Sequence, residues 1–388
     1  MSRCLAGGWS GFEACESVPP FPLVEKREKK KSARFLWVHH HHATEMMDVP
    51  WRCSGILIIQ RQRKGVFDKP GFCFVQRVPM SIQESVCLKS KNWFQTGGTA
   101  RYYAAPATEA AVVDAIQFAS TNGLKIVVLG EGANVLFSDE GVDGLVISPK
   151  NTQIVCDAEG ASITAGAGVS MPYLINFALA RNLLGLEEFS GIPGTVGGSV
   201  YINIHYFEFM LGQFLTAATV INLKSGTALR VDRGWFGFAY NQSTLQGHEW
   251  LLFDATFALR RGTDIEAAYA RGRQHEIERH RHRRYPTART CGSFFRNFLP
   301  DELNAIVGQK KVPFVAYYLE KAGVKGELRL GGASVSHLHA NMIVTEEGAT
   351  SADVVAVSRV MQIRVRELCG LTPQPECRLI GFDAYPLL

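Results

Sequence analysis

Two glycine-dense segments are the clearest candidates for binding a ligand. GEGAN at residues 130–134 directly follows a compact β-branched run, and SGIPGTVGGS at 190–199 holds four glycines in eight residues beside a proline. Glycine lets the backbone approach a ligand closely, and successive exposed N–H groups form a concavity that binds anions. The second segment therefore indicates phosphate or pyrophosphate binding, whereas the first alone fits a tight turn equally well.

Neither segment matches the common nucleotide-binding patterns. No Gly-Lys-Ser/Thr follows either one, which argues against a P-loop. Gly130-x-Gly132 lacks the third glycine of the dinucleotide fingerprint and a suitably placed acidic residue about 20 positions further on.

The surrounding pattern predicts the elements that position these segments. A strand at 100–104, a helix at 109–121 capped by Thr108 and followed by Gly123, and a strand at 125–129 form a β-α-β unit. Further strands are expected at 144–148, 152–156, 161–165, 219–223 and 251–259, with a second helix from Ser170 to about residue 182. Because helices and strands are mixed, the expected class is α+β.

The last part of the chain contains the most regular helical pattern. An Arg- and His-rich helix at 263–285 is expected to link two domains, and a later helix is expected to start at the N-cap Ser351 and stop at Gly370. Its apolar residues recur at spacings of three and four: Val354, Val357, Met361, Val365 and Leu368. This stripe indicates core packing rather than a cofactor site.

Composition excludes several classes of protein. The 388 residues are 46% hydrophobic and 20% charged, which is typical of a soluble globular protein with two or three domains. No run approaches the roughly 18 apolar residues of a membrane span. Nine cysteines without a CxxC motif indicate free thiols in a reducing cytoplasm. His337 and His339 lack an evident third ligand, so no metal site is expected.

The net charge of +5 is concentrated in the first quarter of the chain. Residues 1–90 hold 14 of the 41 basic and 8 of the 36 acidic residues, which leaves 27 basic and 28 acidic residues for 91–388. The first segment carries a basic run at 26–31 and four histidines at 39–42. It shows no convincing periodicity, so a disordered or poorly packed extension is expected, with Met46, Met47 and Met80 as alternative starts.

Six ordered motifs resemble the UDP-N-acetylenolpyruvoylglucosamine reductase family, of which the chain would be a divergent member. SGIPGTVGGS is similar to the family's flavin-binding segment, and LGEGANVL at 129–136 to its first flavin-pyrophosphate loop. CGSFFRN at 291–297 is similar to its catalytic serine motif. NWFQTGGTA at 92–100, GGASVSHLHANMIV at 331–344 and PECRLIG at 375–381 match in the same order. The resemblance covers about residues 91–385.

The resemblance implies a two-lobed FAD-binding module of the vanillyl-alcohol-oxidase type at 91–262, the linker helix at 263–285 and a smaller α+β substrate-binding domain at 286–388, after the extension at 1–90. It also implies non-covalent FAD and NADPH as the reductant. Hydride would reach the enolpyruvyl C3 of a UDP-sugar substrate through the flavin, and a protein acid would protonate C2. Such an oxidoreductase serves peptidoglycan synthesis, and hence cell-wall biogenesis, cell shape and cell division, in the cytoplasm.

The resemblance also implies site residues. Ser293 matches the family's proton donor and Glu376 its catalytic glutamate, while Tyr240, Arg296, Asn297 and His339 match substrate-binding positions. The expected flavin-binding residues are Gly130, Gly132, Ala133, Asn134, Gly191, Ile192, Pro193, Gly194, Thr195, Gly197 and Gly198.

One position departs from the family pattern. Asn241 stands where a catalytic arginine is expected, and an amide carries no charge with which to bind a carboxylate. The bulky segment at 205–208 replaces a small loop after the flavin motif. Three explanations are open: another arginine such as Arg289 or Arg284 supplies the charge, the chain is from a divergent subfamily, or its substrate differs. We favour the first two.

Two other functions are alternatives. One is a flavin oxidase or dehydrogenase of the same fold that acts on another sugar or alcohol. The other is a non-catalytic nucleic-acid-binding protein led by the basic extension, although the near-neutral organised region and the acidic residues within the 263–285 helix argue against it. Neither a nucleic-acid nor a membrane partner is expected, and the oligomeric state is open, with a monomer consistent with the sequence.

Overall fold

The structure is a computed structural model that describes residues 81–388 except 158, 305 and 307–310. The basic run, the histidine run and the alternative starts lie outside the described residues. Among the described helices, none is long and apolar enough to cross a membrane.

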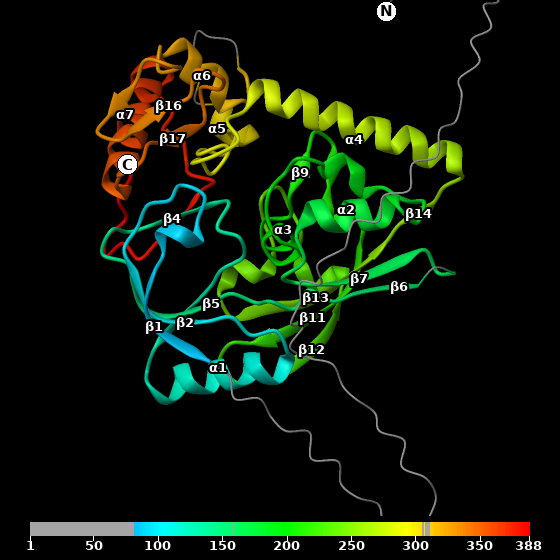
Figure 1. Cartoon of the computed structure of the whole chain (residues 1–388). Helices are drawn as coiled ribbons and strands as arrows, with labels where there is room; N and C mark the ends of the chain where they lie inside the picture. Colours follow the sequence, from blue (N-terminus) through cyan, green and yellow to red (C-terminus); the bar gives the residue numbers. More distant parts are fainter. Residues whose placement is uncertain (1–80, 158, 305, 307–310) are drawn as a thin grey trace, which may run out of the picture. The chain divides into compact units, whose positions relative to one another are not determined.

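The first lobe is a four-stranded sheet covered by one helix. Its strands lie in the order β1 (Ile82–Cys87), β2 (Thr99–Ala104), β5 (Val142–Ile147) and β3 (Lys125–Val128). The strands β2 and β3 run parallel to β5, as a β-α-β unit requires. Helix α1 (Glu109–Thr121) packs on this sheet (Figure 1) through one buried face, and the Thr108 hydroxyl accepts its capping bond from the Ala111 N–H.

Organised structure begins earlier than the sequence pattern predicts. Strand β1 pairs antiparallel with β2 from Ile82 to Cys87, within the segment expected to be an extension. Most of its side chains are exposed because it is an edge strand, which explains why no hydrophobic alternation is visible in its sequence.

The second lobe is a five-stranded antiparallel sheet. Its order is β12 (Ala228–Asp232), β11 (Leu215–Asn222), β13 (Trp250–Ala258), β7 (Ser162–Gly166) and β6 (Ile154–Asp157). Helices α2 (Met171–Leu179) and α3 (Val196–Ile202) share one buried core with it. Helix α2 is shorter than expected, since it ends at Leu179 rather than near 182, and Ser170 occupies the N-cap without a side-chain bond.

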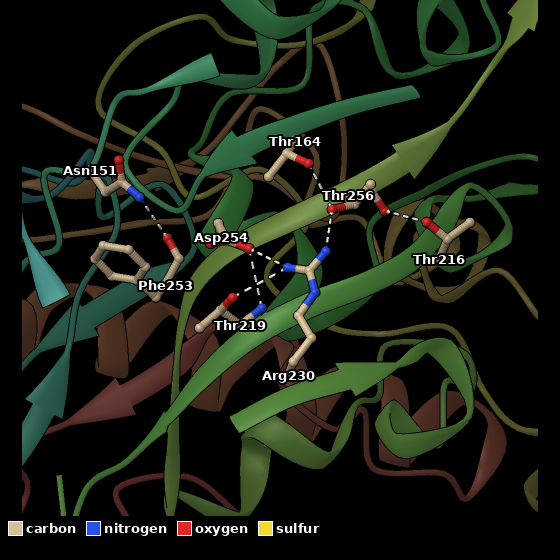
Figure 2. Close-up of polar contacts among 8 residues, drawn as sticks. All are labelled: Asn151, Thr164, Thr216, Thr219, Arg230, Phe253, Asp254 and Thr256. Carbon is tan, nitrogen blue, oxygen red and sulfur yellow. Dashed lines mark hydrogen bonds and ion pairs between the residues drawn. The ribbon is translucent and has the colours of Figure 1, made fainter. Parts of the chain in front are cut away.

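The opposite face of this sheet carries a polar network (Figure 2). Arg230 donates to Asp254 at 2.8 Å, to the Thr219 hydroxyl at 3.2 Å and to the Thr256 hydroxyl at 2.7 Å. The Thr164 and Thr256 hydroxyls lie 2.8 Å apart and extend the network to β7. Because these groups join four neighbouring strands, the network stabilises the strand register from the solvent side.

A long helix connects this module to the C-terminal part. Helix α4 (Asp264–Arg284) starts with a capping box formed by Thr263 and Glu266, and Figure 1 shows it as one continuous helix. It leads to α5 (Pro300–Leu303), α6 (Val315–Lys321), the sheet of β15 (Arg329–Leu330), β16 (Ala333–Val335) and β17 (Ile343–Thr345), and α7 (Ser351–Cys369).

Helix α7 has the predicted core stripe but a different cap. Val354, Val357, Met361 and Val365 are fully buried in the C-terminal core, and Gly370 ends the helix at φ 80°. The N-cap is Thr350, one residue before the prediction, because its hydroxyl accepts from the Asp353 N–H. The neighbouring Ser351 hydroxyl is buried and instead donates to Thr96 at 2.8 Å.

The chain ends by returning to the first lobe. Strand β18 (Arg378–Ile380) pairs in parallel with β4 (Val135–Phe137), which directly follows the first glycine segment. The remaining short strands form two pairs: β8 (Leu183–Leu184) with β14 (Arg260–Arg261), and β9 (His205–Tyr206) with β10 (Phe209–Met210). The pairing of β18 with β4 places the PECRLIG segment beside the glycine segment.

Candidate active site

A cavity of about 980 Å³ lies where the glycine segments, the 240–241 turn and the C-terminal segments meet. This volume is at the upper end of the range for small-molecule pockets and suits a large ligand. Ten of the eleven expected flavin-binding residues line it: Gly130, Gly132, Ala133, Asn134, Ile192, Pro193, Gly194, Thr195, Gly197 and Gly198. The eleventh, Gly191, is not among the lining residues and accepts a hydrogen bond from Arg281 at 2.9 Å.

The two glycine segments approach each other too closely for larger side chains. A Cβ at Gly130 would lie 2.7 Å from the Thr195 hydroxyl, and that hydroxyl accepts the capping bond of α3 from the Gly198 N–H. At Gly132, φ is +69° and a Cβ would meet the Lys91 carbonyl oxygen. These glycines therefore keep the floor of the cavity formed by backbone, where the N–H groups of the 130–134 segment are available to a phosphate.

The two predicted catalytic residues come from neighbouring extended segments. The Phe294 carbonyl, directly after Ser293, accepts a 2.8 Å bond from the Glu376 N–H. On its other side, Asn341 clamps the serine segment: its carbonyl accepts from the Phe294 N–H, and its side chain exchanges bonds of 3.0 and 2.7 Å with the Phe295 backbone. The structure thus brings Ser293 and Glu376 to one wall of the cavity.

Glu376 has the electrostatic environment of an acid that titrates near neutral pH. Burial raises its pKa from 4.5 to about 7, while a hydrogen bond from Asn241 and the charge of Arg378 oppose the rise. The Asn241 Nδ2 donates to Oε2 of Glu376 at 3.0 Å. A carboxyl with this pKa can hold or release a proton under physiological conditions.

Tyr240 and Asn297 also line the cavity. The Tyr240 hydroxyl accepts from the Asn297 N–H at 3.4 Å, and the Tyr240 ring packs 4.8 Å from the His205 ring. Burial and the nearby Glu376 charge raise the pKa of Tyr240, so its hydroxyl stays protonated and can donate a hydrogen bond to a ligand.

Arg296 and His339 are not among the cavity-lining residues. Arg296 forms a two-bond ion pair with Glu302, at 2.8 and 2.7 Å, and donates to the Asn297 carbonyl at 3.0 Å. His339 packs against the Tyr285 ring at 5.3 Å, and burial, together with the charge of Arg284, lowers its pKa to about 4. The structure therefore does not bring these two predicted substrate-binding residues to the lining of the cavity.

The arginines considered as replacements at position 241 also lie elsewhere. Arg289 donates to the Glu346 carbonyl at 3.2 Å, and Arg284 lies 3.2 Å from His280. The arginines that do line the cavity are Arg281 and Arg378. Arg378 belongs to the PECRLIG motif, but its partner Gln246 comes from a distant turn, so no local sequence signal points to the pair.

Three buried polar atoms at the cavity have no partner within the described protein: Asn134 Oδ1, Asn241 Oδ1 and Arg378 Nε. Unpaired buried polar groups are costly and rare in native proteins. They indicate a polar ligand that offers both donors and acceptors. A flavin dinucleotide and an anionic sugar nucleotide both have this character, so the lining residues fit FAD and a nucleotide substrate.

Comparison with known proteins agrees with this geometry. Residues 100–232 match the family model described as FAD binding domain, and residues 284–380 match that of UDP-N-acetylenolpyruvoylglucosamine reductase, C-terminal domain. The UDP-N-acetylenolpyruvoylglucosamine reductase of a Nostoc species is 33% identical over 301 residues, which cover 77% of this chain and 86% of the relative. The chain belongs to the UDP-N-acetylenolpyruvoylglucosamine reductase family.

The chain is also similar to other members of the reductase family. The enzyme of Solibacter usitatus is 33% identical over 314 residues, which cover 78% of this chain and 97% of the relative. The crystal structure of the Thermus caldophilus reductase superposes with a TM-score of 0.64 at 27% identity, covering 78% of this chain and all of that one. The α+β class, the two-lobed FAD-binding module and FAD as cofactor are therefore confirmed.

Proposed function

We propose that this chain catalyses the NADPH-dependent reduction of UDP-N-acetylglucosamine enolpyruvate to UDP-N-acetylmuramate, with non-covalently bound FAD. The observation that carries the proposal is the meeting of Ser293 and Glu376 at a cavity whose floor is made by the two glycine segments. Neither alternative considered from the sequence, an oxidase of the same fold or a nucleic-acid-binding protein, is favoured by the comparisons.

The glycine segments would hold the cofactor. Backbone N–H groups of residues 130–134, together with those of Gly194 and Thr195, would bind its pyrophosphate, and Asn134 offers an unpaired acceptor beside them. When bound, FAD supplies the hydride chemistry that amino-acid side chains lack.

The side chains of Ser293 and Glu376 would carry out the proton transfer to the substrate. Reduction of an enol ether conjugated to a carboxylate adds a hydride at C3 and a proton at C2, and the electron pair of the hydride builds negative charge on the carboxylate that needs stabilisation. Ser293 would donate the proton to C2, as its position in the CGSFFRN motif implies. Glu376, hydrogen-bonded to Asn241, would hold a proton next to the developing enol and stabilise it.

Tyr240 and Asn297 are the proposed direct contacts to the sugar nucleotide, because both line the cavity and offer neutral donors and acceptors. Arg296 would act indirectly, by positioning Asn297. Its guanidinium donates to the Asn297 carbonyl and pairs with the Glu302 carboxylate, which fixes this turn. His339 would support Tyr285, which does line the cavity. We place the reaction in peptidoglycan precursor synthesis in the cytoplasm, and hence in cell-wall biogenesis, cell shape and cell division.

The purified chain should be yellow and should oxidise NADPH only when the enolpyruvyl substrate is added. The measurement is a flavin absorbance spectrum followed by NADPH oxidation with and without that substrate. A colourless protein that does not take up added FAD would refute the proposal. Rapid reoxidation by oxygen without the enolpyruvyl compound would instead support an oxidase.

A further inference from the structure

We infer that Arg378, oriented by Gln246, binds the carboxylate of the substrate and supplies the positive charge that Asn241 lacks. The inference rests on the proposed function, since it concerns the enolpyruvyl carboxylate. It replaces the sequence-based candidates Arg284 and Arg289 with a residue from the last strand of the chain. Arg378 would be a catalytic residue in contact with substrate, and Gln246 a positioning residue.

Arg378 lies in the immediate surroundings of the catalytic pair. It lines the same cavity as Ser293, Asn241 and Glu376 and is separated from Glu376 by one residue. Its backbone N–H bonds to the Asn134 carbonyl at 3.1 Å, and the Asn134 side chain donates to the Glu376 carbonyl at 3.4 Å. The first residue of β18 is thereby tied to the glycine segment, so the position of its backbone is set by the flavin module.

The guanidinium group has a buried donor with no partner. Its Nε is inaccessible to solvent and makes no hydrogen bond among the described residues, although Nη2 donates to Gln246 Oε1 at 2.6 Å. A buried N–H of a charged group is expected to be paired, and an anion in the cavity would pair it. Arginine binds a carboxylate through short, charge-assisted hydrogen bonds.

Gln246 connects this arginine to the turn that contains Asn241. Its amide donates to the Asn241 carbonyl at 2.8 Å and to the Tyr201 carbonyl at 3.1 Å, while its oxygen accepts from Arg378. The Arg378 guanidinium also lies 5.5 Å from the centre of the Tyr201 ring. One side chain therefore bonds both to the backbone of the uncharged position 241 and to the charged group of Arg378.

The other cavity arginine serves a different region. Arg281 bonds to the Gly191 carbonyl and lies 5.0 Å from the Tyr285 ring, with no contact to Asn241 or Glu376 among those described. Arg378 is also available to bind a second anion, because the raised pKa of Glu376 keeps that carboxyl about half protonated at pH 7 and largely protonated below it. The positive charge of Arg378 is then not fully neutralised by Glu376.

The test compares two ligands that differ by the carboxylate. The enolpyruvyl substrate carries it, and UDP-N-acetylglucosamine lacks it. Binding of each to the flavin-loaded enzyme is followed by the change in flavin absorbance. Arg378→Gln should weaken binding of the enolpyruvyl compound by about 10- to 100-fold and leave that of UDP-N-acetylglucosamine within about 3-fold. NADPH should still reduce the flavin in this variant.

Gln246→Met should weaken enolpyruvyl binding selectively, by about 3- to 10-fold, because Arg378 remains but loses its orienting bond. Arg289→Gln is the matched control and should bind both ligands like the parent enzyme. If Arg378→Gln does not retain flavin, Arg378→Lys keeps the charge, and it should show a smaller loss that is again confined to the enolpyruvyl compound.

Equal weakening of both ligands in the Arg378 variants would make the residue structural and overturn the inference, as would unchanged enolpyruvyl affinity in Arg378→Gln. A parent enzyme that holds flavin but neither binds nor reduces the enolpyruvyl compound would refute the proposed function itself, which separates the two failures.

Discussion

Ser293 is accessible to the cavity because its segment is held straight from both sides, by Asn341 and by the backbone of Glu376. Ser293→Ala should leave flavin reduction by NADPH intact and slow reduction of the enolpyruvyl substrate by about 10²-fold or more, the usual contribution of a positioned proton donor. Stopped-flow measurement of the two half-reactions checks this. Ser90→Ala, on the surface, is the control, and an equal loss in both half-reactions would show that Ser293 is structural.

Glu376 should make stability depend on pH in a definite direction. Its unfolded pKa is near 4.5 and its folded pKa about 7, so the folded protein holds one more proton between these values. The free energy of unfolding therefore falls as the pH rises through this window. Glu376→Gln should remove this dependence. Relative to the parent, the free energy of unfolding of the variant should therefore rise by on the order of 3 kcal/mol between pH 4.5 and 8.

Urea unfolding of flavin-free protein at several pH values measures this effect. Parallel curves for the parent and Glu376→Gln would contradict the burial of an uncharged carboxyl at this position. Glu302→Gln is a useful contrast, because Arg296 lowers the pKa of Glu302 and its stabilisation should instead be lost as the pH falls through the acidic range.

At the scale of elements, the contact between the glycine segments gives a steric prediction. Gly130→Ala would press a methyl group against the Thr195 hydroxyl, 2.7 Å away, and disturb the cap of α3. We expect its affinity for FAD to fall by about 10-fold or more, since one lost hydrogen bond and the shifted backbone cost roughly 1–2 kcal/mol. Flavin fluorescence during titration measures the affinity.

Gly272→Ala is the matched control for that variant. Gly272 is exposed within α4, and a Cβ there would meet nothing within 4 Å. The change should leave FAD affinity unaltered and raise the free energy of unfolding by about 0.5–1 kcal/mol, because alanine is the better helix former. Unchanged flavin affinity in Gly130→Ala would show that the close approach of the two segments has no role in binding.

The elements that the sequence predicts well are those with local signals. Helix α1 follows its Thr108 cap, α4 its Thr263 capping box, and α7 its apolar stripe and Gly370 stop. The edge strand β1 and the short α3 were not predicted, since the first is mostly exposed and the second lies within a glycine-rich segment. The predicted cap of α7 is one residue too late because Ser351, the more favoured capping type, directly follows the actual cap Thr350.

The residues of the candidate site also divide into those with a local sequence signal and those without one. The glycine segments, Ser293 and Glu376 carry motifs that can be read along the chain, and the structure places them at one cavity. The contacts between Gln246 and Arg378 and between Asn241 and Glu376 join residues far apart in sequence, so one sequence without its fold gives no indication of them. For the same reason, the sequence leads to Arg284 and Arg289 as the replacement charge and does not single out Arg378.

At the scale of the whole molecule, all cavity-lining residues lie between Ile126 and Tyr385. A chain that starts at Met80 keeps every strand described, including β1, and should bind FAD and reduce the enolpyruvyl substrate with kinetic constants within about 3-fold of the parent. Flavin content and steady-state rates of the two chains check this. Loss of flavin from the shorter chain would show that the first 79 residues contribute to the site.

The parallel pairing of β18 with β4 also has a consequence for biosynthesis. The Asn134 side chain bonds to the Glu376 carbonyl across 242 positions of the sequence, and the strand that carries Arg378 is the last one of the chain. Contacts between such distant segments form slowly, and on the ribosome the second partner emerges more than 240 residues after the first. The nascent chain therefore has an open site until β18 has emerged, and tight flavin retention would mark only molecules that contain this strand.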